Sequence, residues 1–170
     1  MKDLFLIKGL NCKKSLKGEL AVHGAKNAAL PAFASAILFK DNVKFENVPY
    51  IEDIRSMREL IENLGGEAER KAAGRWEIEA AKLRKTELDH DLAKHMRASI
   101  VLTGPILGRY GEVSFPHPGG CVLGERPLDM FIETFKKMGA VLTQDADVYR
   151  LSTRGKKLRG AEIFLPVRPT

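Results

Sequence analysis

One pattern in this chain occurs twice and predicts its fold, and its first copy is the stretch Glu52-Asp-Ile-Arg-Ser-Met-Arg-Glu-Leu-Ile-Glu-Asn-Leu-Gly-Gly66. Its apolar residues Ile54, Met57, Ile61 and Leu64 have the spacing of one helix face, and the two glycines end the helix. The same spacing returns at Leu128, Phe131, Phe135 and Met138, each 74 positions later (128 − 54 = 74), and again a glycine follows. This self-similarity predicts a protein built from repeated units.

The residues around these two helices predict the same order of elements in each unit: helix, strand, helix, strand, strand. We expect a leading strand at 19–22 and then, in the first unit, a helix at 27–39, a strand at 43–45, a helix at 52–64 and a hairpin of 67–70 and 76–79 turning at Ala73-Gly74. In the second unit we expect a helix at 94–107, a strand at 113–115, a helix at 128–138 and a hairpin of 140–142 and 148–151. Alternating apolar and polar residues at 76–79 are typical of a half-buried strand with one face in water.

A third unit begins near the end of the chain. The segment at 158–164 resembles the segment at 16–22, at an offset of 142, which is two periods of 71. Repeat units bury their faces against neighbours, and roughly three are needed for stability. We therefore expect a fragment of a longer protein, or a chain that completes its core with another chain, self-association included.

Composition is that of a globular protein, and the two cysteines and four histidines show no metal-ligand spacing. The net charge of +6 suits an anionic partner. The densest basic cluster, at 154–159, contains no aromatic residue for base stacking, so small phosphorylated molecules fit the charge at least as well as nucleic acid. No apolar run approaches the ~20 residues of a membrane span, and no signal peptide is evident. We expect a cytoplasmic protein with no membrane or nucleic-acid partner.

The two units differ in the connection between strand and second helix, which is four residues longer in the second unit (74 − 70 = 4). The extra residues fall in 116–125, within the segment Pro118-Gly-Gly-Cys-Val-Leu-Gly-Glu-Arg-Pro-Leu-Asp129. Long connections on repeated scaffolds commonly carry function. A thiol, Cys121, in a glycine-rich loop before Arg126 predicts an acid or nucleophile on a catalytic loop. A surface turn with an incidental cysteine is the alternative.

Cations precede equivalent helices in the two units. Lys26 and Asn27 open the first helix, and Arg97 occupies the matching place in the second unit (97 − 26 = 71). Free N–H groups at a helix start favour an anion, so a lysine there predicts a negative ligand. Together with Arg126, these side chains could bind a phosphorylated or carboxylated substrate. The alternative is that Asn27 is an ordinary N-cap and Lys26 is solvated.

Three segments carry a resemblance to a known family: Gly24-Ala-Lys-Asn-Ala-Ala-Leu-Pro31, Met96-Arg-Ala-Ser99 and 118–129. They are similar, in order and spacing, to N-terminal motifs of the UDP-N-acetylglucosamine 1-carboxyvinyltransferase family, the enolpyruvyl transferases of bacterial peptidoglycan synthesis. The resemblance extends to about Ile163. The sister family that acts on shikimate 3-phosphate shares the fold but lacks this cysteine loop.

The resemblance implies an α/β (α+β) fold of repeated βαβαββ units, the inverse α/β barrel, with two domains of three units each and the active site between them. Residues 1–23 would then be strands of the other domain. Residues 24–170 would form an incomplete domain, with unit one at about 16–80, unit two at about 88–153 and the start of unit three at 158–170.

The resemblance also implies a reaction in which the 3′-hydroxyl of UDP-N-acetylglucosamine adds to phosphoenolpyruvate, C3 is protonated and phosphate leaves. Cys121 would donate the proton and would be the residue alkylated by fosfomycin. Lys26 and Asn27 would bind phosphoenolpyruvate, and the nucleotide sugar would contact Arg97, Arg126, Pro127, Leu128, Asp129 and Met130. No cofactor or metal is implied. The aspartate base of the family would follow Thr170, so we expect no turnover by this chain alone. The alternative is a non-catalytic fragment that binds a UDP-sugar or a partner.

Overall fold

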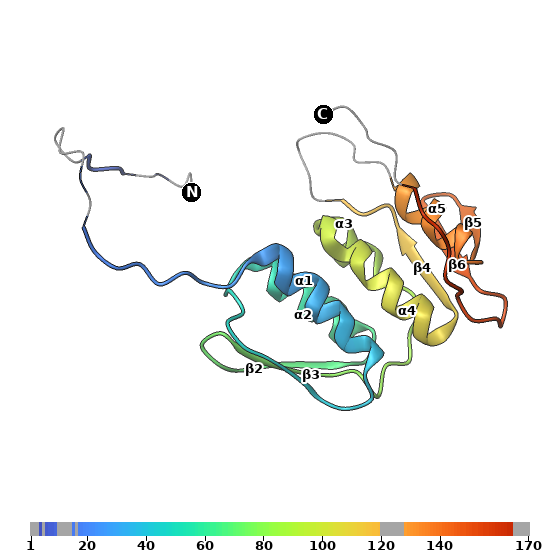
Figure 1. Cartoon of the computed structure of the whole chain (residues 1–170), viewed down its shortest axis with the longest axis horizontal. Helices are drawn as coiled ribbons and strands as arrows, with labels where there is room; N and C mark the ends of the chain where they lie inside the picture. Colours follow the sequence, from blue (N-terminus) through green and yellow to red (C-terminus); the bar gives the residue numbers. More distant parts are fainter. Residues whose placement is uncertain (1–3, 5, 10–14, 16, 120–127, 165–170) are drawn as a thin grey trace.

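The computed structural model of the chain describes residues 4, 6–9, 15, 17–119 and 128–164, and Figure 1 gives their arrangement. The first unit contains α1 (Lys26–Ser35), the 3₁₀ helix η1 (Ala36–Leu38), β1 (Val43–Phe45), α2 (Glu52–Asn63), β2 (Glu67–Ala72) and β3 (Arg75–Glu79). The second contains α3 (His90–His95), the 3₁₀ helix η2 (Arg97–Leu102), α4 (Thr103–Tyr110), β4 (Glu112–Pro116), α5 (Asp129–Lys137), β5 (Val141–Asp145) and β6 (Val148–Ser152). The predicted α/β fold and its repeat are confirmed.

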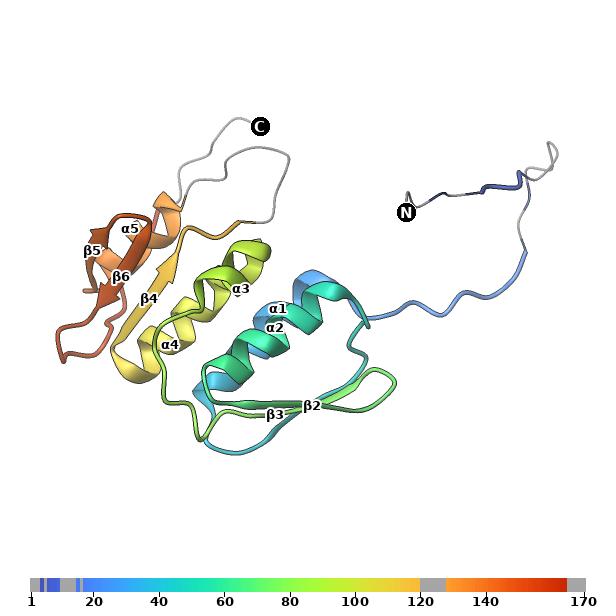
Figure 2. The same ribbon diagram turned by 180° about the vertical axis from the view of Figure 1, so that it is seen from behind.

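The two sheets have the same topology. Each is three-stranded and antiparallel, with the order β1-β3-β2 in the first unit and β4-β6-β5 in the second. The first hairpin turns at the predicted residues 73–74, and the second turns at 146–147. Helices α1 to α4 lie between the two sheets, as Figures 1 and 2 show from opposite sides. The described part of both units shares one continuous apolar core.

The repeated helices end in the same backbone geometry. Gly65 and Gly139, 74 positions apart, both have a φ of 100°, a value that glycine adopts without a steric cost. The next N–H group donates back into the last turn in each case, from Gly66 to the carbonyl of Ile61 (3.0 Å) and from Ala140 to that of Phe135 (2.9 Å). These bonds satisfy carbonyls that would otherwise lack partners at the helix end. The 74-residue period seen in the sequence is therefore a period of the backbone.

Arg109 ties the two units together. Its Nη1 donates from α4 to the carbonyl oxygens of Ile37 (2.6 Å) and Ala80 (2.8 Å), both in the first unit. The neighbouring Tyr110 hydroxyl donates to the carbonyl of Leu83 at 3.1 Å. Ile37 lies in η1, Ala80 follows β3 and Leu83 lies in the loop before α3, so two side chains of α4 connect the second unit to backbone carbonyls at and after the end of the first.

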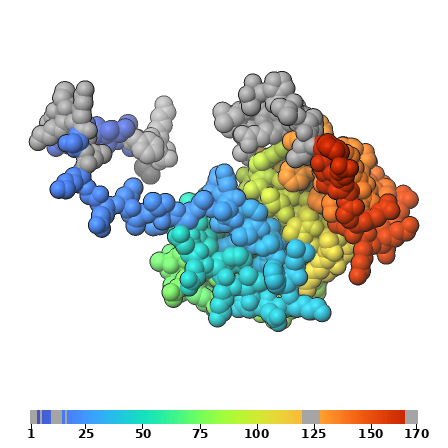
Figure 3. All heavy atoms as spheres, viewed as in Figure 1, coloured from blue at the N-terminus to red at the C-terminus, as the bar shows by residue number. Residues whose placement is uncertain are grey.

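The predicted strand at 19–22 is wrong. This segment is extended but pairs with no strand in the described chain, and Leu20 and Val22 are 90% and 85% exposed. Figure 3 shows it leaving the body of the molecule before α1. A strand requires a neighbour to accept and donate its backbone hydrogen bonds, and no described strand pairs with this segment. The similar segment at 158–164 is likewise not in a strand.

The predicted continuous helix at 94–107 is also wrong, because it is three helices. The backbone at Met96 is extended (φ −137°, ψ 117°) and separates α3 from η2. Pro105 has no N–H to donate to the carbonyl four residues earlier, and it lies in the first turn of α4, where a helix has no such bond to lose. The Asp89 carboxylate accepts from the N–H groups of Asp91 and Leu92 at 3.1 and 3.0 Å and thereby starts α3 earlier than predicted.

Candidate functional site

Lys26 and Asn27 open α1, as the sequence predicted. The N-cap is Ala25, which makes no side-chain capping bond, so the alternative in which Asn27 caps the helix is wrong. The ammonium group of Lys26 lies 2.8 Å from Asp53 Oδ2 in the first turn of α2. Both side chains are part-exposed (50% and 36%), so the pair is worth about 1 kcal/mol or less. Lys26 therefore has an anionic partner within the chain, but one that a phosphate could replace at small cost.

Arg97 begins η2, the second unit's counterpart of the start of α1. It is half-buried, and η2 packs directly against α1. The start of α1, the end of α3 and the carboxyl end of β4 lie at one end of the molecule in both Figure 1 and Figure 2. The fold therefore brings the predicted cations of the two units to the end at which the long connection begins.

The long connection is described only at its two ends. Cys121, Arg126 and Pro127 lie outside the described residues. At the far end, the Leu128 side chain is buried in the core, whereas Asp129 and Met130 are exposed in the first turn of α5. A ligand at this end would meet the exposed side chains and the backbone rather than the side chain of Leu128.

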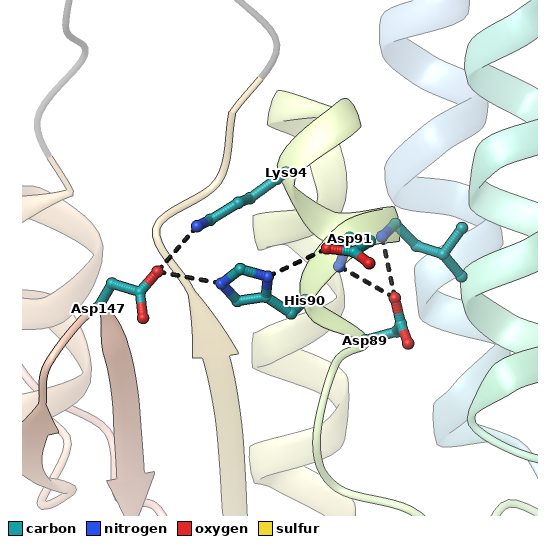
Figure 4. A network of polar contacts seen from close by, with 6 residues as sticks. Asp89, His90, Asp91, Lys94 and Asp147 are labelled. Atoms are coloured by element: carbon teal, nitrogen blue, oxygen red, sulfur yellow. Dashed lines mark hydrogen bonds and ion pairs between the residues drawn. The ribbon is translucent and has the colours of Figure 1, made fainter.

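The near end of the connection, residues 117–119, is called the stem here, and it is held by a cluster that sequence reasoning missed (Figure 4). Asp147, in the β5–β6 turn, accepts through Oδ2 from Lys94 Nζ (2.8 Å) and pairs with His90 Nε2 (3.0 Å). Its backbone carbonyl accepts from the N–H of His117 at 3.2 Å. A Cβ on Gly119 would lie 1.9 Å from the carbonyl oxygen of Lys94, so only glycine allows this approach.

The charges of this cluster support one another. Lys94, followed by His90, holds the pKa of the Asp147 carboxyl at about 2, well below its usual range. Asp147, followed by Asp91, raises the pKa of the His90 imidazole by accepting its hydrogen bond. No sequence pattern links His90 and Asp147, because they lie 57 positions apart (147 − 90 = 57) and only the fold of the second unit brings them together.

The described part of the chain offers neither a candidate metal centre nor a candidate membrane span. It contains no group of three or more His, Cys, Asp or Glu side chains that could hold a metal ion. No helix within it is long and apolar enough to cross a bilayer.

The sequence profile of the family described as EPSP synthase (3-phosphoshikimate 1-carboxyvinyltransferase) matches residues 10–168 of the chain. The chain belongs to the EPSP synthase family. Within it, the chain is 39% identical over 163 residues to the UDP-N-acetylglucosamine 1-carboxyvinyltransferase of Pseudoalteromonas atlantica, a match that covers 96% of this chain and 38% of the relative. The protein of the same name from Granulibacter bethesdensis is 42% identical over 153 residues, covering 89% and 36%.

A solved structure supports the fold alone. The enolpyruvyl transferase NikO from Streptomyces tendae matches with a TM-score of 0.71 and 20% identity, over 84% of this chain and 31% of that chain. The chain thus spans little more than a third of the length of the curated relatives it matches. The resemblance inferred from the three motifs is confirmed at the level of family and fold.

Proposed function

We propose that this chain is the N-terminal part of a transferase that moves the enolpyruvyl group of phosphoenolpyruvate to the 3′-hydroxyl of UDP-N-acetylglucosamine and releases phosphate. The observation that carries the proposal is the order of the three motifs in a chain matched over 96% of its length to a relative of that name. The step would belong to cytoplasmic synthesis of peptidoglycan precursors, and hence to cell-wall formation, cell shape and cell division.

In this proposal Lys26 and Asn27 bind phosphoenolpyruvate. Lys26 supports this role because it is the first residue of a ten-residue helix, where free N–H groups already attract a phosphate. Its pairing with Asp53 is part-exposed, so the phosphate would displace a weak partner. Arg97 would bind the nucleotide sugar together with Arg126, Pro127, Leu128, Asp129 and Met130, with Leu128 contributing through its backbone.

Cys121 acts as the proton donor to C3 of phosphoenolpyruvate as the 3′-hydroxyl adds to C2, and C3 loses a proton again when phosphate leaves. A thiol has an ordinary pKa of about 8.5, which lets it hold a proton at neutral pH and give it up to a developing carbanion. The longer connection of the second unit supports this role, because the first unit has no thiol at the equivalent place. The family's base would lie beyond Thr170, so the chain alone would not turn over, and residues 1–23 would join the other domain.

The alternative function is a non-catalytic fragment that binds a UDP-sugar or a partner. It is favoured by one observation, the 38% share of the relative's length that the chain spans. Self-association is the partner interaction with structural support. The exposed face of α5 presents an apolar hollow of about 330 Å³ lined by Met130, Phe131, Thr134 and Phe135. Surface helices do not usually leave such a face to water.

Calorimetric titration of UDP-N-acetylglucosamine into the chain tests the proposal. We expect measurable binding, a loss of at least about tenfold in Arg97→Ala, and wild-type affinity in the control Arg84→Ala, which removes an exposed arginine from the loop before α3. Folded wild type that does not bind, or Arg97→Ala that binds normally, would contradict the proposed nucleotide-sugar site. Phosphate release in the presence of both substrates would contradict the expected lack of turnover.

A further inference from the structure

The stem of the long connection is anchored at two points by the second unit. The N–H of His117 donates to the backbone carbonyl of Asp147, and Gly119 lies directly against the backbone of Lys94. Both anchoring residues also join their side chains to each other, across 2.8 Å. The stem is therefore held between the β5–β6 turn and α3, and a charge pair links its two anchors, as Figure 4 shows.

The first unit makes the corresponding contacts without charges. There the N–H of Val48 donates to the carbonyl of Gly74 at 3.0 Å, and Gly74 holds the turn position that Asp147 holds in the second unit. Gly24, just before α1, comes so close to the connection that a Cβ on it would lie 1.8 Å from the carbonyl oxygen of Asn47. Gly74 thus stands where the second unit has the carboxylate of Asp147, and at the offset of 71 the position of Lys94 corresponds to His23 (94 − 71 = 23). The charged cluster is present only in the unit whose connection is longer.

We propose that Asp147, His90 and Lys94 are positioning residues that fix the stem at 117–119, and with it the point from which the Cys121 connection starts. The local part of this proposal stands on the described contacts, and only its consequence for Cys121 rests on the proposed function. Asp147 is central because one oxygen, Oδ2, serves both cationic partners. Removing it leaves His90 and Lys94 with no shared acceptor.

The cluster is suited to local rather than global control. All three side chains are about half exposed, and exposed pairs contribute little to global stability. Local opening of a loop stem, however, is a low-energy event that such contacts can govern. The proposal therefore predicts a change in the opening of the stem with little change in the unfolding of the whole chain.

Amide hydrogen exchange followed by NMR tests the positioning role directly. In Asp147→Asn we expect the protection of the His117 amide to fall about five- to tenfold, while the Val48 amide, its counterpart in the first unit, keeps its protection. Lys94→Met should lower His117 protection in the same way, and Lys94→Arg should restore it. Asp145→Asn, which removes an exposed carboxylate from the same hairpin, is the matched control. Unchanged His117 protection in Asp147→Asn, or an equal fall at Val48, would overturn the proposal.

A second readout separates this proposal from the proposed function. With UDP-N-acetylglucosamine present, we expect fosfomycin to alkylate Cys121 several-fold more slowly in Asp147→Asn than in wild type or Asp145→Asn. If wild-type Cys121 is not alkylated at all, the proposed function fails, and the exchange measurement still decides the positioning role. If His117 protection falls but alkylation keeps its rate, the cluster does not position Cys121, and that part of the proposal is overturned.

Discussion

Helices α2 and α5 occupy the same place in their units, yet only α2 is part of the core. Met57 of α2 is fully buried, whereas Phe131 of α5, its counterpart 74 positions later, is 42% exposed. Helix α2 packs against α1 and α3, one from each unit, while α5 packs chiefly against β5 of its own sheet. The apolar spacing is therefore the same in α2 and α5, and the elements that pack against each helix determine which of its apolar side chains are buried. Burial in a repeat protein belongs to the interface between units rather than to the unit.

The connections of the two units differ in the same instructive way. The first unit needs six residues, 46–51, to pass from β1 to α2, whereas the second needs twelve, 117–128, from β4 to α5. The first is anchored by glycines and the second by an ion-paired cluster. The two units thus share the topology of their sheets and the geometry of their helix ends, but they differ at the connection that contains Cys121.

The largest effect is expected from truncating the two helix faces in parallel. Met57→Ala removes a fully buried side chain and should lower the free energy of unfolding by about 2–5 kcal/mol. Phe131→Ala, at the equivalent position, should cost about 1 kcal/mol or less because water already reaches the ring. Urea unfolding of both variants measures the difference. Equal losses would show that the face of α5 is covered in solution.

The tie between the units gives the next largest effect. Arg109→Ala removes the guanidinium that donates to the carbonyls of Ile37 and Ala80, of which Ala80 alone keeps a second donor in the N–H of Leu83, and should destabilise the chain by about 1–3 kcal/mol in thermal or urea unfolding. Lys156→Ala, an exposed cation removed from the loop after β6, should change stability by less than about 0.5 kcal/mol. If the two variants behave alike, Arg109 does not couple the units.

The apolar face of α5, exposed in the described part of the chain and formed around Phe131, should make the chain associate with itself. In sedimentation velocity we expect a concentration-dependent increase in size, and we expect Phe131→Glu to weaken association at least tenfold, about 1.4 kcal/mol, by placing a charge in the apolar hollow. Glu59→Gln, on an exposed site of α2, should have no effect. A chain that stays monomeric at every concentration would exclude a second copy as the occupant of this face.

The smallest effect concerns the titration of the second unit's cluster. In an NMR titration the pKa of His90 should lie above its usual value and fall towards about 6.5 in Asp147→Asn. Because folding raises the pKa of His90, the pairing of its protonated ring stabilises the folded stem fully below the unfolded-state pKa of about 6.5. This stabilisation is lost as the pH rises through the folded-state pKa. Folding lowers the pKa of Asp147 from 3.8 to about 2, so the ionised carboxylate stabilises the folded stem fully above pH 3.8. This stabilisation is lost as the pH falls through about 2. Stem protection at His117 should therefore be greatest between about pH 4 and 6.5. An ordinary His90 pKa in wild type would contradict the pairing.

Much of the fold could be predicted because the repeat is written in local patterns. Apolar spacing and the glycines that follow it located α2 and α5, and both hairpins were located with strand ends within three residues of those observed. The strand expected at 19–22 failed because strand formation depends on a partner that local pattern does not reveal. The prediction of one helix at 94–107 was wrong because the extended backbone at Met96 and the change from η2 to α4 before Pro105 divide this segment. Apolar spacing alone does not show either break.

The candidate site was predictable only where it is local. Lys26 and Asn27 could be placed at a helix start from the sequence, because the motif and the helix are contiguous. The ion pair from Lys26 to Asp53 and the cluster around Asp147 depend on contacts between distant elements, so no spacing rule could find them. A comparison of the two units could have helped, because Gly74 and Asp147 differ at equivalent turn positions.

Peptide mapping after fosfomycin treatment tests most directly whether the altered connection carries the chemistry. With UDP-N-acetylglucosamine present, we predict one adduct on Cys121, little on Cys12, and none in Cys121→Ser. The nucleotide sugar should accelerate the modification, because the proposed site binds it beside the thiol. Equal labelling of both cysteines that ignores the nucleotide sugar, or an unmodified Cys121 in a folded chain, would contradict the account.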